Sequence, residues 1–68
     1  MTTLNINRQK TFDEVMEKQG VCNGIRKGKE IYVFNELKVP VFYDCFSAEQ
    51  EAVSFLNRMK YRYGKRLK

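Results

Sequence analysis

The last eleven residues of the chain, RMKYRYGKRLK, hold six lysines or arginines and no acid. Residues 1–57 hold the other seven basic side chains and all eight acids, so the excess positive charge lies at the C-terminal end. Each cation placed on a phosphate releases condensed counterions, which gives salt-sensitive affinity for nucleic acid. A helix C-terminus also favours cations, by about 0.3–1 kcal/mol each, but that effect does not account for the cations beyond the expected helix end, Lys65, Arg66 and Lys68.

Two tyrosines lie inside this basic segment. Tyr61 is expected to point outward between Arg58 and Arg62, where its ring can stack on an unpaired base at about 1–3 kcal/mol. Packing against the edge of a sheet is an equally weighted alternative for Tyr61, and it is the expected role of Tyr63.

A second basic cluster, Arg26-Lys27-Gly28-Lys29, has the composition of a hairpin tip. The two clusters together form the predicted nucleic-acid interface, which we expect to contact phosphates with little base specificity. Its members are Arg26, Lys27, Lys29, Arg58, Lys60, Tyr61, Arg62, Lys65, Arg66 and Lys68.

The chain lacks the side chains that most catalytic and metal sites require. It has no histidine, the commonest general base at neutral pH, and Ser47 has no sequence neighbour that could activate it. Cys22 and Cys45 alone cannot supply the four ligands of a structural zinc site. We therefore expect no enzymatic activity, no catalytic residue, no metal and no cofactor. Two reduced thiols are favoured over a disulfide.

A length of 68 residues allows one domain, 1–68, with a basic end at 58–68. A domain this small buries only about 60% of the surface of its unfolded chain, so pairing with a partner or with a second copy would add stability. An apolar content of 43% is too high for a disordered chain. No apolar run approaches the roughly 20 residues of a membrane span, and the first residues lack a signal-peptide core, so we expect a cytoplasmic protein without membrane contact.

The first twenty residues predict a short extended segment and then a short helix. Leu4 and Ile6 alternate with polar residues, which favours a strand or an extended arm. Thr11, three residues before Glu14, forms a capping-box pattern that marks a helix start. The helix is expected to run for about two turns and to end before Gly20.

Residues 21–46 change to a β pattern, which predicts three antiparallel strands in a meander. The first two strands flank a turn at Lys27-Gly28, with Asn23-Gly24 as a rival turn. Residues 35–38 have the length of a hairpin loop, and the third strand lies within VPVFYDCF.

Alternation along the second strand leaves two registers open. If Ile31 and Val33 are buried under a helix, Tyr32 and Phe34 face outward near the hairpin tip. A basic and aromatic sheet face of this kind is one way to enter a major groove or to bind RNA. The opposite register buries the two aromatic side chains instead.

A long helix is predicted from Ala48 to Tyr63. Ser47 and Gln50 give a second capping-box pattern, and Gly64 provides the stop. The apolar side chains of this helix fall within an arc of about 100°, as expected for a helix lying on a sheet. The predicted fold class is therefore α+β: a short N-terminal helix, a three-stranded antiparallel meander and a long C-terminal helix packed on the sheet.

The strand–helix junction Phe46-Ser-Ala-Glu-Gln-Glu-Ala52, with Phe55-Leu56 one turn later, resembles the arm-type or AP2-like DNA-binding domains of tyrosine recombinases. In that family three strands precede a helix, a polar cap follows a strand-ending aromatic residue, and the opposite sheet face lies in the major groove. The resemblance covers residues 21–59 and implies that layering, with DNA as the ligand. The chain departs from the family in its additional first helix and in lacking a tryptophan or arginine reader on the second strand.

The double-stranded RNA-binding domain also runs helix, three strands, helix. Its second helix begins with a lysine cluster, whereas this chain has Glu49 and Glu51 at that place. The acidic start argues against that family, and we favour DNA over RNA as the partner.

Two functions from different classes fit these observations. The first is a small non-enzymatic nucleic-acid-binding protein that uses the interface named above. The second is a small modulator or inhibitor of the phage or mobile-element type, acting in the host cytoplasm on a protein complex that handles nucleic acid. Its anchors would be exposed aromatic and arginine side chains.

Overall fold

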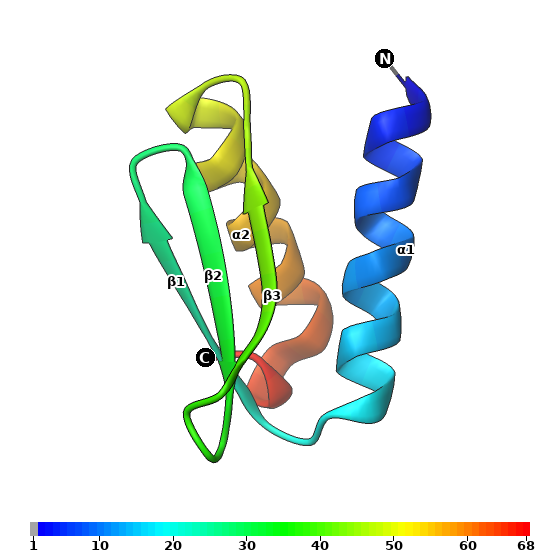
Figure 1. Ribbon diagram of the computed structural model, residues 1–68, viewed down its shortest axis with the longest axis vertical. Coiled ribbons are helices and arrows are strands. Elements are labelled where there is room, and N and C mark those ends of the chain that lie inside the picture. Colours follow the sequence, from blue (N-terminus) through cyan, green and yellow to red (C-terminus); the bar gives the residue numbers. More distant parts are fainter. Residues whose placement is uncertain (1) are drawn as a thin grey trace.

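The computed structural model describes the backbone of residues 2–68 and the side chains of residues 8–68 (Figure 1). The elements follow the order α1 (Thr2–Lys18), β1 (Cys22–Lys27), β2 (Glu30–Asn35), β3 (Pro40–Cys45), α2 (Glu49–Tyr63) and the 3-10 helix η1 (Gly64–Arg66). The predicted α+β class and the order helix, three strands, helix are confirmed. None of the described helices combines the length and the apolar character needed to cross a membrane.

The first helix is much longer than the sequence predicts. α1 begins at Thr2 and contains 17 residues, so the strand or arm expected at Leu4 and Ile6 is wrong, and so is a helix start at Thr11. Residues 2–10 contain neither glycine nor proline, and nothing in them stops a helix from extending towards the N-terminus. The pattern of Thr11 and Glu14 therefore lies inside α1, where backbone N–H groups already bond four residues back.

The three strands form one antiparallel sheet in the order β1-β2-β3. The β1–β2 turn lies at Gly28-Lys29, where Gly28 has a φ of 60°, a left-handed conformation that glycine adopts without strain. The predicted hairpin tip is confirmed. The rival turn at Asn23-Gly24 is wrong, because both residues belong to β1 and pair with β2.

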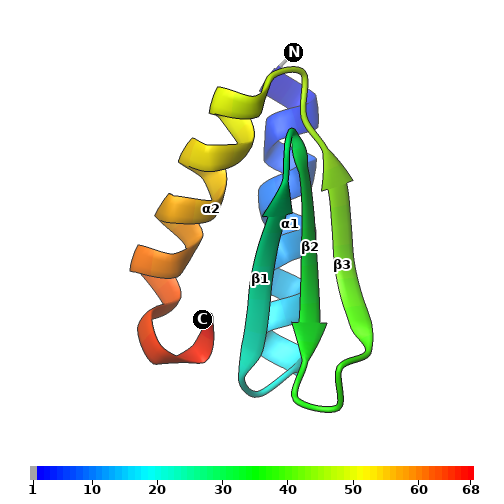
Figure 2. The same cartoon turned by 90° about the vertical axis from the view of Figure 1, so that its left-hand side faces the viewer.

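The register of β2 follows the first of the two alternatives. Ile31 and Val33 have no exposed surface, whereas Tyr32 and Phe34 are half-buried on the opposite face. Figures 1 and 2 show that α1 and α2 cover the same side of the sheet. The other side, which we call the open face, has no helix over it.

A single core lies between the sheet and the two helices. Phe12 of α1 is fully buried, and its ring centroid lies 5.1 Å from that of Phe42 in β3 and 5.5 Å from that of Phe55 in α2. Edge-on contacts of this kind add about 0.5–1.5 kcal/mol each to the burial of the rings. The core residues are Phe12, Met16, Cys22, Ile31, Val33, Phe42, Phe46, Ala52, Phe55, Leu56, Met59 and Leu67.

The start of α2 differs in detail from the prediction. The helix begins at Glu49 with Ala48 as its N-cap, and no side chain bonds to the free N–H groups, so the capping box expected from Ser47 and Gln50 is wrong. The carbonyl of Ala48 accepts the N–H of Ala52 at 3.3 Å, while acidic Glu49 and Glu51 occupy the first turn. Negative charge at this position favours the helix dipole.

The chain after α2 folds back onto β1 instead of extending into solvent. Leu67 forms a parallel bridge with Cys22 and is only 2% exposed. The Lys68 N–H donates to the Cys22 carbonyl at 2.9 Å, and the Gly24 N–H donates to the Lys68 carbonyl at 2.8 Å. A Cβ on Gly24 would lie 2.9 Å from Leu56 Cδ1, so the missing side chain at this position makes room for the apolar residues that cover β1.

Candidate nucleic-acid interface

The exposed surface of the C-terminal half of α2 carries three of the predicted residues side by side. Arg58, Tyr61 and Arg62 stand at i, i+3 and i+4, a spacing that places them on one helix face, and all three are exposed. The ring of Tyr61 is 92% exposed, so it does not pack on the sheet. We call these three residues the basic stripe.

The cations of the basic stripe have few carboxylate neighbours. Arg62 Nη2 lies 3.9 Å from Asp13 Oδ2, and 57% of the Arg62 side chain remains exposed. The Arg58 guanidinium lies 5.9 Å from the ring centroid of Phe55, a contact that leaves its charge available. Within residues 8–68, Asp13 is the one side-chain carboxylate within ion-pair distance of a cation in 58–68.

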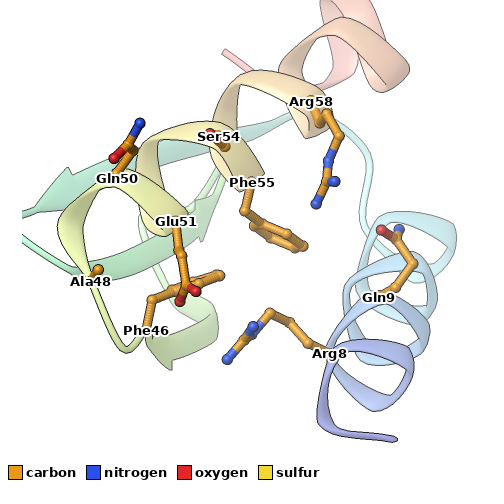
Figure 3. A pocket seen from close by; sticks show the side chains of 9 residues that line it. All are labelled: Arg8, Gln9, Phe46, Ala48, Gln50, Glu51, Ser54, Phe55 and Arg58. Atoms are coloured by element: carbon orange, nitrogen blue, oxygen red, sulfur yellow. The ribbon is translucent and has the colours of Figure 1, made fainter. Parts of the chain in front are cut away.

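α1 adds cations that the sequence interpretation missed. A groove of about 850 Å³ between the helices is lined by Lys10 of α1 and by the whole basic stripe. It adjoins a pocket of about 610 Å³ in which the guanidinium groups of Arg8 and Arg58 approach the same space, with Phe55 between them (Figure 3). Arg8 and Lys10 were missed because the predicted helix began only at Thr11, which left both residues outside any element expected to face α2.

Arg8 also has a structural role in this pocket. Its guanidinium lies 3.8 Å from the ring centroid of Phe46 and pairs with the carboxylate of Asp44 in β3. A cation held over an aromatic face is stabilised by the ring quadrupole. Arg8 therefore links α1 to the end of the sheet, and Arg58 is the freer of the two arginines.

The hairpin tip is remote from the basic stripe. Arg26 Nη1 lies 2.7 Å from Glu49 Oε2 and 2.7 Å from the Gly28 carbonyl oxygen, which places the tip beside the first turn of α2 (Figure 2). The stripe occupies the last turns of the same 15-residue helix, whose length is about 22 Å. Two of the predicted tip residues, Lys27 and Lys29, remain exposed, but the structure does not bring them near residues 58–68.

The cations of the terminal segment have separate positions. Arg66 Nη2 donates to the carbonyl of Met16 and, at 3.1 Å, to that of Gln19, so this guanidinium serves the C-terminal end of α1. The stem of Lys60 passes over β1. Lys65 is exposed in η1, and Lys68 is exposed alongside β1. The residues beyond the end of α2 are therefore not a free extension, because Arg66 bonds to the end of α1 and the backbone of Lys68 bonds to β1.

Tyr63 belongs to the core region and not to the interface. Its ring centroid lies 5.7 Å from that of Phe12, and its hydroxyl donates to the carboxylate of Asp13. Burial, followed by the bond to Asp13, raises the pKa of Tyr63. The expected packing role of Tyr63 is confirmed, with Phe12 of α1 as its partner where a sheet edge had been expected.

The open face of the sheet carries a row of apolar and aromatic side chains. Ile25, Tyr32 and Tyr43 are direct cross-strand partners on β1, β2 and β3, and the rings of Tyr32 and Tyr43 lie 5.0 Å apart. Phe34 stands beside Tyr32 at 6.5 Å with nearly parallel rings. Lys27 Nζ lies 5.8 Å from the ring centroid of Tyr32.

Tyr32 should ionise late in an alkaline titration. Its hydroxyl donates to Glu30 Oε1 at 2.6 Å, and this bond raises the pKa of Tyr32 from 10.0 to about 12. Because the folded-state pKa lies above the unfolded one, the bond's contribution to stability is complete below pH 10 and is lost as the pH rises towards 12. Absorbance of tyrosinate should show a step near pH 12 that disappears in Tyr32→Phe and moves to lower pH in Glu30→Gln. A step that keeps its position in Glu30→Gln would contradict the assignment.

The side chains of the basic stripe and of the open face can contact charged and aromatic groups. Cationic side chains, an exposed tyrosine and a half-exposed aromatic row suit phosphates and ring systems, and residues 8–68 contain no cluster of histidine, cysteine or carboxylate side chains that could hold a metal ion. Cys22 is buried, which raises the pKa of its thiol, and Cys45 is exposed; both are free. Comparisons of the chain with protein-family models, with curated proteins and with solved structures found no match.

Proposed function

We propose that this protein binds nucleic acid through phosphate contacts made by the basic stripe and the exposed lysines that follow it. The observation that supports this most is the basic stripe itself: Arg58, Tyr61 and Arg62 are exposed on one helix face, with Asp13 as their one carboxylate neighbour within residues 8–68. Lys10 faces the same groove from α1. Phosphate contacts of this kind position a nucleic acid without reading its sequence.

The distribution of charge along α2 also favours phosphate binding at its C-terminal turns. Of the two acids in its first turn, Glu49 is paired with Arg26, whereas Glu51 lines the same pocket as Arg8 and Arg58, two turns before Arg58. A phosphate approaching Tyr61 and Arg62 in the last turns of α2 therefore meets cations, with Asp13 as the carboxylate that lines the same groove. Screening limits each repulsion or attraction to about 10 Å at moderate salt, which is less than the length of the helix.

The stripe is a better candidate for duplex contact than the open face. In the arm-type domains that the sequence resembles, the open face enters the major groove, where arginine, asparagine and glutamine read base edges. The open face here presents Ile25, Tyr32, Phe34 and Tyr43 in the central rows of the sheet. We therefore propose that duplex phosphates contact α2. We also propose DNA over RNA as the ligand, and the cytoplasm as the place where the protein acts.

The test is a binding titration by fluorescence anisotropy with duplex DNA, single-stranded DNA and RNA at about 50 and 200 mM salt. Affinity should fall with a slope of about −0.9 per phosphate contact in the logarithmic salt plot. Arg58→Gln/Arg62→Gln should make that slope shallower by about 2 for duplex DNA, while Arg58→Lys/Arg62→Lys should keep it.

The control variant is Lys27→Gln/Lys29→Gln, which removes the same charge at the opposite end of α2. It should cost less affinity for duplex DNA than the arginine pair does. Equal losses in the two variants would mean that affinity follows net charge alone, and the stripe would then have no special role. Absence of binding at low salt to all three probes would reject the proposal.

A protein-binding modulator is the second candidate, and one observation favours it. Leu37 is 81% exposed and Val39 is 49% exposed in the β2–β3 turn, and exposed apolar side chains that gather on one surface are typical of docking sites. Capture of a protein complex that persists after nuclease treatment, together with no change in Arg58→Gln/Arg62→Gln, would favour this function over the first.

A further inference from the structure

The open face is built as a small aromatic platform between two groups of lysines. Its middle row is Ile25–Tyr32–Tyr43, with the Tyr43 side chain 55% exposed. Phe34 extends the platform towards the β2–β3 turn, and its ring is nearly parallel to that of Tyr32. The hydroxyl of Tyr32 donates a hydrogen bond to Glu30, so the Glu30 carboxylate already has a partner within the sheet.

A hollow of about 590 Å³ lies at one end of the platform. It is lined by apolar Ile25 and Phe34 together with Lys38, Lys68 and the acidic Glu36. Pockets of about 300–1,000 Å³ hold small organic groups, so a nucleobase with its sugar fits within it. An apolar wall beside two lysines matches a base next to its phosphates, with Glu36 as the one carboxylate side chain in the lining.

The two lysines of this hollow are positioned by the backbone. Asn35 Oδ1 accepts the N–H of Leu37 at 2.9 Å and of Val39 at 3.0 Å, which fixes the turn that carries Lys38. Lys68 is held alongside β1 by its two backbone hydrogen bonds. Successive residues of an extended segment point to opposite faces, so burial of Leu67 turns Lys68 towards the open face.

We propose that the open face binds a single-stranded nucleic acid, with one base in the hollow beside Phe34 and a second on Tyr43. Lys38 and Lys68 at one end of the sheet and Lys27 at the other would contact the phosphates of the same strand. β2 spans about 20 Å at 3.3 Å per residue, a length suited to a short run of nucleotides. Stacking accepts any base, because every base has a π face.

The ligand class follows from the side chains that the platform offers. Aromatic rings with lysines at both ends suit stacking on unpaired bases, whereas a duplex hides its base faces. A protein partner without negative charge would leave four exposed or flanking cations, Lys27, Lys29, Lys38 and Lys68, uncompensated around the apolar centre. The surface lies on the side of the sheet opposite to both helices (Figure 2), so it is separate from the basic stripe and does not rest on the function proposed for it.

The intrinsic fluorescence of the protein provides the test, since the chain has four tyrosines and no tryptophan. A short oligothymidylate should quench it as bases stack on Tyr43. The matched pair is Tyr43→Phe, which keeps a ring, and Tyr43→Leu, which removes it. Tyr43→Leu and Phe34→Leu should each weaken oligothymidylate binding by about 5- to 100-fold, while Tyr43→Phe retains the affinity of the unmodified protein.

Further substitutions test the role of charge and distinguish the open face from the basic stripe. Lys68→Gln should make the salt slope for oligothymidylate shallower by about 0.7, whereas Lys18→Gln on α1 should leave it unchanged. Arg58→Gln/Arg62→Gln should weaken duplex binding and leave the effect of Tyr43→Leu on single strands intact. Equal affinity of Tyr43→Leu and Tyr43→Phe for oligothymidylate overturns the proposal, and so does a concentration-dependent dimer that Tyr43→Leu dissociates, because the open face would then be covered by a second copy.

Discussion

Deletion of residues 64–68 is expected to unfold the domain, because this segment completes the core. Leu67 is 2% exposed and packs over β1, and loss of a buried leucine side chain costs about 2–5 kcal/mol. The deletion also removes the two backbone hydrogen bonds to β1 and the Arg66 contacts with the end of α1. A domain of 68 residues has a total stability of only about 3–10 kcal/mol.

Circular dichroism during urea denaturation measures this effect. The truncated chain should show little folded signal at any urea concentration, and Leu67→Ala should lower the free energy of unfolding by about 2–5 kcal/mol. Lys68→Gln is the control, because it keeps the backbone bonds and should change stability by less than about 0.5 kcal/mol. A truncated protein with an unchanged midpoint would show that the terminal segment is not part of the core.

This result decides how binding experiments have to be designed. Removal of the basic residues by truncation would abolish binding whether or not they contact nucleic acid, because the fold is lost with them. Glutamine substitutions at Arg58, Arg62 and Lys68 remove charge and leave the core in place. Because Leu67 is part of the core, point variants that remove a charge are a sharper test of binding than truncation.

Phe12→Ala should have a comparable effect on stability from the other end of the chain. The Phe12 side chain is fully buried and contacts the rings of Phe42, Phe55 and Tyr63. Replacement of a buried phenylalanine by alanine costs about 3–5 kcal/mol, from lost burial and from the cavity that remains. For a domain of this size, that loss is close to its entire stability.

The Phe12 prediction is checked by thermal and urea denaturation of the variant beside the unmodified protein. Tyr61→Ala is the matched aromatic control, since its ring is 92% exposed and surface replacements usually change stability by less than about 0.5 kcal/mol. If Phe12→Ala proved as mild as Tyr61→Ala, α1 would be a detachable addition to the sheet and α2, and the single core described above would be wrong.

The parts of the fold that were predictable from sequence are those with strong local patterns. Three strands separated by turn residues, and a helix from Ala48 to Tyr63 with a clear apolar stripe, agree with the structure to within a residue at the ends of α2. The choice of buried face on β2 was left open, because Ile31-Tyr-Val-Phe34 is apolar at every position. Contacts with both helices settle it, and those contacts are not local.

The N-terminal error has a physical reason. Leu4 and Ile6 are two apolar residues in a five-residue window, which is too short to distinguish a period of 2 from one of 3.6. A capping-box pattern at Thr11 indicates only that a helix can begin at this residue. The pattern does not indicate whether the residues before Thr11 are helical. α1 therefore starts nine residues earlier, and with it Arg8 and Lys10 come to face α2.

The candidate interface was predictable in composition and not in layout. The sequence placed Arg58, Tyr61 and Arg62 together correctly, because they lie on one helix. It could not separate Arg66 from its neighbours, since that side chain bonds to carbonyls 47 and 50 residues away. Nor could it reveal that the hairpin tip lies at the far end of α2, which depends on how the sheet packs on the helix.

Leu67 follows in chain order the elements that it covers, and this bears on how the protein is made in the cell. During synthesis, β1 and the apolar side of α2 exist before the residue that covers them, so the nascent chain exposes Cys22 and Leu56 until residue 67 has left the ribosome. Exposed apolar surface of this kind is prone to aggregation. Rapid synthesis of the segment from α2 to residue 67, or a chaperone bound to the nascent chain, would therefore have more influence on the yield of this protein than on that of a domain whose core closes early.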